Sequence, residues 1–201
     1  MLRRRAPLAR RPWDEVECWA LDLEMTGLDP ARDRIVAVGM VPVRRRAVLL
    51  GEAFTSLVRP DGPVGTSGIA AHHLLPSQLA EAPELGAVLA EVDRRLEGAV
   101  LVVHAAGVDG PFLRRAHEQA GRPWVEPPVV DTMALLRRHE RHRHVHAPAE
   151  SAGPAGLAAA RAALGLPPHR AHDALADAVA TAELLLVLAH RLGARTVGDL
   201  L

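Results

Sequence analysis

The sequence contains no lysine, no tyrosine and a single cysteine, Cys18. One cysteine cannot form an intramolecular disulfide and does not indicate an oxidising compartment. No apolar stretch approaches the roughly 20 residues that a membrane-spanning helix needs, and residues 1–13 lack the apolar centre of a signal peptide. We therefore expect a cytoplasmic protein that does not bind membranes, with Cys18 in its core.

The sequence also lacks an excess of either charge. Its 24 basic residues, all arginine, balance 24 acidic ones, so the formal net charge is zero. Proteins that coat nucleic acids through charge alone carry a large basic excess, so this composition excludes that mode of binding but allows a local basic cleft. Five arginines precede Asp14 without an opposing acid, which favours a frayed basic tail over an organellar transit segment. We predict a flexible basic tail at residues 1–14 and one domain at residues 15–201.

Apolar periodicity predicts an α/β domain. Three neighbouring apolar runs with turn residues between them indicate an antiparallel meander, and later runs alternate with helical patterns, which indicates parallel strands. The expected fold is therefore a three-layer α/β/α domain, with a five-stranded mixed sheet whose first strand is central and whose second is antiparallel to it. The expected strands are 19–27, 34–43, 47–58, 99–103 and 129–130, and the expected helices are 84–96, 111–120, 133–141, 154–164 and 173–192.

The first chemical motif is Asp22-Leu23-Glu24, at the end of the first apolar run. Side chains at positions i and i+2 of a strand share a face, so the two carboxylates point the same way, roughly 7 Å apart at the backbone. Their neighbours are Trp, Ala, Leu and Met, so water solvates neither charge easily. Two anions in such a place favour a bound cation.

Two further motifs add acidic residues. Asp109 follows the strand at 99–103 and precedes Pro111, where it could cap a helix, bind a metal, or do both. Asp177 lies in the first turn of the last apolar helix, where a charge needs a partner. His172 would lie about 140° from Asp177 in one continuous helix, so we expect it on the preceding loop, with Asp173 as the helix N-cap.

The segment 139–151 interrupts the pattern with four histidines, two arginines and no apolar spacing. An exposed loop is the favoured interpretation. Four histidines could instead bind a transition metal, and this alternative stays open.

Together these motifs resemble those of the DEDDh 3′-to-5′ exonucleases, the ribonuclease H-like family that includes the proofreading epsilon subunit of bacterial DNA polymerase III. An Asp-x-Glu pair at a strand end, an Asp in a strand-to-helix turn and His-x4-Asp at the start of the last helix occur in that order and spacing. The resemblance covers residues 17–188. Residues 22–29 also look like the oligoribonuclease branch, whereas His104 before the second motif looks closer to the epsilon-like branch.

The chain departs from the family pattern in the second motif, where Ala105 and Val108 occupy places commonly held by Asn and Phe. We expect the loss of that aromatic to affect the rigidity of the site more than its chemistry. The absence of tyrosine excludes the variant of the fold that uses Tyr in place of the catalytic His.

The resemblance implies hydrolysis of phosphodiester bonds at the 3′ ends of single-stranded DNA or RNA, releasing nucleoside 5′-monophosphates. It implies two divalent cations, Mg²⁺ or Mn²⁺, held by four carboxylates, and His172 as general base, a role suited to a side chain whose ordinary pKa is about 6.5. A DNA polymerase is a candidate partner. The alternatives are a non-catalytic nucleic-acid-binding or interaction module and an oligoribonuclease-like enzyme acting on short RNA. The implied metal ligands are Asp22, Glu24, Asp109 and Asp177, and the implied substrate contacts are Met25, Thr26, Gly27 and His104.

Overall fold

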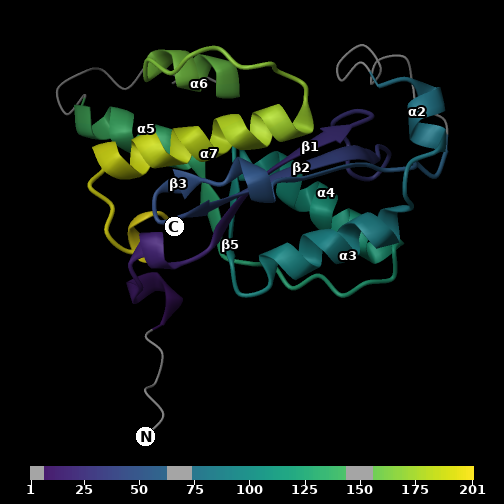
Figure 1. Ribbon diagram of the computed structural model, residues 1–201, viewed down its shortest axis with the longest axis horizontal. Coiled ribbons are helices and arrows are strands. Elements are labelled where there is room, and N and C mark those ends of the chain that lie inside the picture. The colour runs from purple at the N-terminus through teal and green to yellow at the C-terminus, as the bar shows by residue number, and fades with distance from the viewer. Residues whose placement is uncertain (1–6, 63–73, 144–155) are drawn as a thin grey trace, which may run out of the picture.

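The structure, a computed structural model, describes residues 7–62, 74–143 and 156–201. A mixed sheet lies between two layers of helices (Figure 1). Its strands are β1 (Cys18–Met25), β2 (Ile35–Arg44), β3 (Ala47–Val48), β4 (Phe54–Leu57), β5 (Val100–Val103) and β6 (Val129–Asp131). The α-helices are α2 (Pro76–Ala80), α3 (Leu85–Leu96), α4 (Ala106–Gln119), α5 (Thr132–Arg143), α6 (Leu157–Ala163) and α7 (Ala174–Arg191).

The sheet confirms the expected fold class. Its order is β3-β2-β1-β5-β6, with β4 also paired to β2. β1 is antiparallel to β2 and parallel to β5, which is parallel to β6. Helices α5, α6 and α7 cover one face, and α3 and α4 cover the other (Figure 1). The first strand, β1, is therefore central, with an antiparallel neighbour on one side and a parallel neighbour on the other.

The predicted third strand is two strands, so the described sheet has six strands rather than five. Val43 of β2 pairs with Val48 of β3, whereas Met40 of β2 pairs with Phe54 of β4. A separation of three residues along β2 thus corresponds to six residues along the segment that carries β3 and β4. The short 3₁₀ turn η3 (Leu50–Glu52) takes up the three extra residues, and periodicity alone did not reveal this offset.

Alternation along β1 divides the core into two clusters. Cys18 and Ala20 belong to the cluster beneath α7, while Trp19, Leu21 and Leu23 belong to the cluster against α3 and α4. Since side chains alternate between the faces of a strand, Asp22 and Glu24 lie on the α7 side. Burial, together with the nearby Glu17 charge, raises the pKa of the Cys18 thiol to about 12, in agreement with its predicted place in the core.

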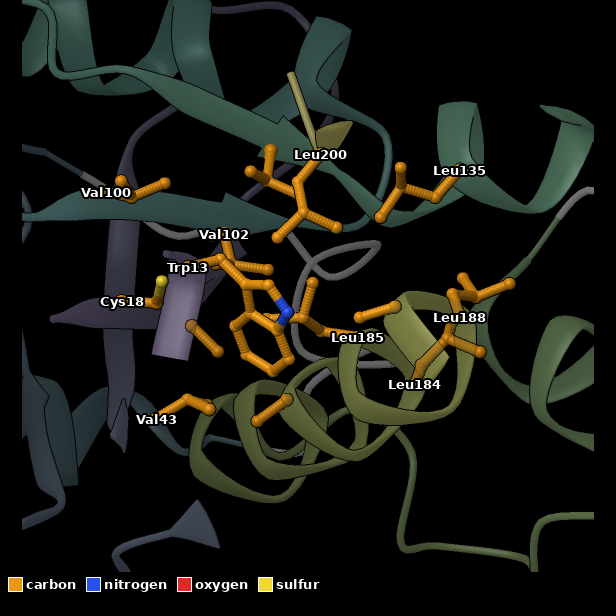
Figure 2. Packing of buried hydrophobic residues seen from close by; sticks show 14 of the residues in the cluster. Trp13, Cys18, Val43, Val100, Val102, Leu135, Leu184, Leu185, Leu188 and Leu200 are labelled. Carbon is orange, nitrogen blue, oxygen red and sulfur yellow. The ribbon is translucent and has the colours of Figure 1, made fainter. Parts of the chain in front are cut away.

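Residues 7–14 correct the predicted tail. Trp13 is only 3% exposed, and its ring packs among core side chains that include Val43 and Leu185 (Figure 2). Its Nε1 donates a hydrogen bond to the Ala194 carbonyl oxygen at 3.1 Å, and Pro12 forms a β-bridge with Thr196. A buried indole fixes this segment to the C-terminal part of the chain, so the packed domain begins before residue 15. Residues 1–6 lie outside the described residues.

Two helices are longer than predicted. Helix α4 begins at Ala106 instead of Pro111, so Asp109 lies inside its first turns and is not its cap. Helix α5 extends to Arg143, so the start of the predicted loop at 139–151 is helical and His139 is buried. The rest of that loop, 144–151, lies outside the described residues. No helix within the described ranges is long and apolar enough to cross a bilayer.

Candidate active site

Three of the predicted acidic residues meet where β1 passes beneath the start of α7. One carboxylate oxygen each from Asp22, Glu24 and Asp177 lies within 4.8 Å of the others. Asp22 and Glu24 arrive through the alternation of β1, and Asp177 arrives from the first turn of α7. The packing of one helix on one strand thus brings together residues about 150 positions apart in the sequence.

Gly39 allows this close packing. It pairs directly with Asp22 in the antiparallel register of β1 and β2. A Cβ atom added at Gly39 would lie 2.2 Å from the backbone carbonyl of Ala174, the first residue of α7. Because real Cβ atoms do not approach backbone so closely, only glycine lets α7 rest on the sheet at this point.

The carboxylates destabilise one another's charged forms. Burial raises the pKa of Asp22 well above its ordinary range, and the charges of Asp109, Asp177 and Glu24 raise it further. Burial, followed by the charges of Asp177 and Asp173, raises the pKa of Glu24 to about 7. The site therefore concentrates acidic groups, and within the described ranges no arginine pairs with Asp22 or Glu24.

Asp109 lies beside this group but not within the tight cluster of three. It is 5% exposed, on α4. Its pKa is raised to about 7, first by burial and then by the charge of Asp131. Its charge raises the pKa of Asp22, so the two carboxylates interact electrostatically. Val108, at the family's aromatic position, is exposed instead of packed behind the site.

Two histidines contact Asp177 from the loop before α7. The backbone N–H of His172 donates to Asp177 Oδ2 at 2.8 Å, and its side chain lies exposed at the wall of a groove. Asp173 accepts a hydrogen bond from the Ala176 N–H at 3.1 Å, so it is the N-cap that the sequence predicts.

His169 is the second histidine, and sequence reasoning missed it. Its Nε2 donates to Asp177 Oδ1 at 2.7 Å, and its side chain is 10% exposed. Both oxygens of Asp177 therefore accept a hydrogen bond from this loop. The available signal was its position three residues before His172 on the same loop, where a second imidazole can reach the same carboxylate.

A groove of about 670 Å³ opens over the acidic residues. Its walls include the carboxylates of β1 and α7 and the backbone after β1. The predicted substrate contacts Met25, Thr26, Gly27 and His104 all line it, together with Leu28, Leu157 and His172.

The ring of His104, which lines the groove, carries a buried hydrogen-bond acceptor. The Thr132 hydroxyl donates to the Val103 carbonyl oxygen at 3.1 Å, so it accepts from His104 Nδ1 at 2.9 Å. The Nε2 atom then carries the lone pair, and it is buried with no hydrogen-bond partner among the described residues. Burial lowers the pKa of this imidazole, which keeps it neutral and able to accept a hydrogen bond.

Stability of the metal-free protein should fall as the pH rises from about 5 to 8. The folded-state pKa values of Glu24 and Asp109, each about 7, lie above the ordinary values of 4.5 and 3.8. The folded protein therefore binds more protons than the unfolded chain between these values, and stability in that range falls with rising pH. Melting temperatures at pH 5, 6, 7 and 8 in a chelator test this. In a Glu24→Gln variant the melting temperature should depend less on pH. A wild-type melting temperature that does not change with pH, or an unchanged pH dependence in the variant, would contradict the prediction.

A mixed sheet with carboxylates gathered at the end of its central strand is the architecture of the ribonuclease H-like fold. The sequence matches the exonuclease family RNase_T over residues 19–185. The chain belongs to this family, which confirms the resemblance found in its motifs.

Known proteins agree with this assignment. A DNA polymerase III subunit epsilon-like protein of Rhodobacter capsulatus is 36% identical over 193 residues, covering 94% of this chain and 26% of that protein. Exonuclease I of E. coli, in a complex with a dT13 oligonucleotide, superposes with a TM-score of 0.75 at 18% identity, covering 89% of this chain and 42% of that one. Exonuclease I of Methylocaldum szegediense superposes with a TM-score of 0.72 at 21% identity. The match covers 89% of this chain and 41% of that one. The chain thus spans about a quarter of the first relative and under half of the other two.

Proposed function

We propose that this protein is a DEDDh-type 3′-to-5′ exonuclease that removes nucleoside 5′-monophosphates from single-stranded nucleic acid with the help of two divalent cations. The observation that carries the proposal is the group of three carboxylate oxygens within 4.8 Å of one another, with Asp109 beside it, beneath an open groove.

The residues of the site fit divalent cations. Oxygen-only donors from carboxylates suit Mg²⁺ and Mn²⁺. Burial and mutual repulsion raise the pKa values of Asp22, Glu24 and Asp109, so nearby positive charge would stabilise all three. Among the described residues, no arginine forms an ion pair with Asp22, Glu24, Asp109 or Asp177.

Each residue then has a role. Asp22, Glu24 and Asp177 would hold one cation, and Asp22 with Asp109 would hold the second. When bound, such a pair of cations supplies positive charge to the attacking and leaving oxygens of a phosphodiester and acidifies the attacking water. The exposed imidazole of His172, tethered through its own backbone to Asp177, accepts the proton of that water. Met25, Thr26, Gly27 and His104 line the path of the terminal nucleotide.

The relatives support a nucleic-acid substrate and suggest a partner. The E. coli exonuclease I structure contains a single-stranded DNA oligonucleotide, and the Rhodobacter relative is named after a polymerase subunit. We therefore propose single-stranded 3′ ends as the substrate and a DNA polymerase as a candidate partner. Five aromatic residues in the whole chain leave few platforms for base stacking, which favours recognition of the sugar and phosphate over recognition of base sequence.

Digestion of 5′-labelled single-stranded DNA and RNA side by side, in Mg²⁺, Mn²⁺ or chelator, tests the proposal. The expected result is a ladder that shortens from the 3′ end, with nucleoside monophosphates released only when a divalent cation is present. Binding of the oligonucleotides without any metal-dependent product would establish a non-catalytic module instead. Cleavage confined to RNA of two to five nucleotides would establish an oligoribonuclease-like enzyme.

The two histidines at Asp177 should behave differently when removed. His172→Ala should lower kcat by about 10²- to 10⁴-fold, the usual contribution of a positioned acid or base, while the affinity for Mn²⁺ stays close to that of the wild type. His169→Ala should weaken Mn²⁺ binding by about 10- to 100-fold, because partners that orient a metal ligand have effects of this size. Its kcat at saturating Mn²⁺ should fall less than that of His172→Ala.

Titration calorimetry with Mn²⁺ and steady-state kinetics on a single-stranded oligonucleotide measure the two quantities separately. The reverse pattern, with kcat lost in His169→Ala and metal affinity lost in His172→Ala, would exchange the two roles.

A further inference from the structure

The carboxylate of Asp131, at the end of β6, fixes the backbone that leads into α4. Its Oδ1 accepts hydrogen bonds from the backbone N–H groups of Ala105 at 3.0 Å and Met133 at 2.9 Å, and its Oδ2 accepts one from Ala106 at 3.1 Å. One side chain therefore serves the first turns of two helices, α4 and α5. The bonds to α4 join residues 25 and 26 positions apart in the sequence.

The turn that Asp131 holds is strained. Ala105 has φ 70° and ψ 67°, the left-handed conformation that side chains other than those of glycine, asparagine and aspartate rarely adopt. An alanine methyl group offers no hydrogen bond that could stabilise this conformation. The N–H groups of Ala105 and Ala106 both donate to Asp131, so its carboxylate keeps the strained peptide in place.

The strained turn sets the position of Asp109. Helix α4 begins at Ala106 and carries Asp109 three residues later, buried and within electrostatic reach of Asp22. If Ala105 relaxed to an ordinary conformation, the start of the helix would change direction, and Asp109 would move with it. The residue before the turn is fixed as well, because His104 Nδ1 donates a hydrogen bond to the Thr132 hydroxyl at 2.9 Å.

We infer that Asp131 is a positioning residue for the metal site: by holding the left-handed turn at Ala105 it keeps Asp109 facing the carboxylates of β1 and α7. In this proposal it acts through the position of Asp109 and is not itself a metal ligand. This inference rests on the proposed function for its link to catalysis, but its link to cation binding can be measured without any nuclease assay.

The test is a set of four variants: Asp131→Asn, Ala105→Gly, and Asp131→Asn combined with Ala105→Gly or with Ala106→Gly. Asparagine keeps the shape of the side chain but places an amide N–H against one backbone N–H. Asp131→Asn should weaken Mn²⁺ binding, measured by titration calorimetry on the metal-free protein, by about 10- to 100-fold. Ala105→Gly alone should bind Mn²⁺ as the wild type does.

The combined variants separate positioning from simple helix capping. Glycine adopts the left-handed conformation without strain, so Asp131→Asn with Ala105→Gly should recover at least part of the lost affinity. The matched control, Asp131→Asn with Ala106→Gly, should recover none, because Ala106 lies within the helix and has no positive φ. Circular dichroism confirms that each variant is folded before its affinity is compared.

Wild-type Mn²⁺ affinity in folded Asp131→Asn would overturn the inference, as would equal affinities in the two combined variants. Nuclease activity is measured in parallel and should follow the Mn²⁺ affinities. If the wild-type protein has no nuclease activity but the affinities follow the expected order, the proposed function fails and the positioning role of Asp131 stands.

Discussion

Asp22→Asn should remove nuclease activity and stabilise the metal-free fold at the same time. Asp22 is the carboxylate that the proposed site uses for both cations. Without the cations the transition state loses several kcal/mol of charge stabilisation, which corresponds to a fall of at least about 10³-fold in kcat. The same carboxylate is half-buried, and burial together with the charges of Asp109, Asp177 and Glu24 raises its pKa. An uncharged amide of the same shape avoids that repulsion, so the melting temperature in a chelator at pH 8 should rise.

Kinetics with Mn²⁺ and melting curves in a chelator measure the two effects. Asp61→Asn is the matched control, because Asp61 is an exposed aspartate outside the acidic group, and it should change neither quantity. A variant that lost activity and also melted at a lower temperature would show that Asp22 has a structural role, in conflict with the repulsion described above.

Gly39→Ala should damage both the fold and the site. The added Cβ would lie 2.2 to 2.4 Å from backbone atoms of Ala174 and Leu175, and backbone cannot move aside as a flexible side chain can. Overpacking of this kind costs about 1–3 kcal/mol of stability. Because the start of α7 must shift to relieve it, Asp177 moves away from Asp22, and a displacement of about 1 Å can lower activity about 10²-fold.

Gly86→Ala provides the matched control for Gly39→Ala. Gly86 lies in α3, where an added Cβ meets no atom within 4 Å. Alanine is a better helix former than glycine by about 0.5–1 kcal/mol, so this variant should be slightly more stable and fully active. Urea denaturation and oligonucleotide digestion measure both variants. Wild-type activity in folded Gly39→Ala would mean that contact between α7 and the sheet does not position Asp177.

Local rules were sufficient for most of the acidic group. The alternation of a strand places Asp22 and Glu24 on one face, and the same alternation in the structure turns them toward α7. The geometry of a helix excluded His172 from the body of α7 and identified Asp173 as its cap, as observed. In both cases the determining residues lie within six positions of one another.

The features that sequence reasoning missed depend on distant contacts. Helix α4 begins at Ala106 because Asp131, which lies 25 residues further along the chain, accepts its first N–H groups. Trp13 is buried among core side chains from distant parts of the chain, and the Ala194 carbonyl, 181 residues away, accepts its indole N–H. No local pattern near Pro111 or near the N-terminus contains this information, so both boundaries were predicted from local signals that tertiary contacts override.

The division of the predicted third strand has a consequence for association between molecules. Exposed sheet edges present unpaired N–H and C=O groups that can recruit strands from other chains. One edge of this sheet is interrupted by the offset between the two-residue β3 and the four-residue β4, so it offers no long straight row of donors. The other edge, β6, has three residues and follows Pro127 and Pro128, which have no N–H to donate. Among the described strands, both borders of the sheet are therefore poor templates for intermolecular β-sheet growth, which disfavours aggregation of a fold with a long, apolar central strand through its edges.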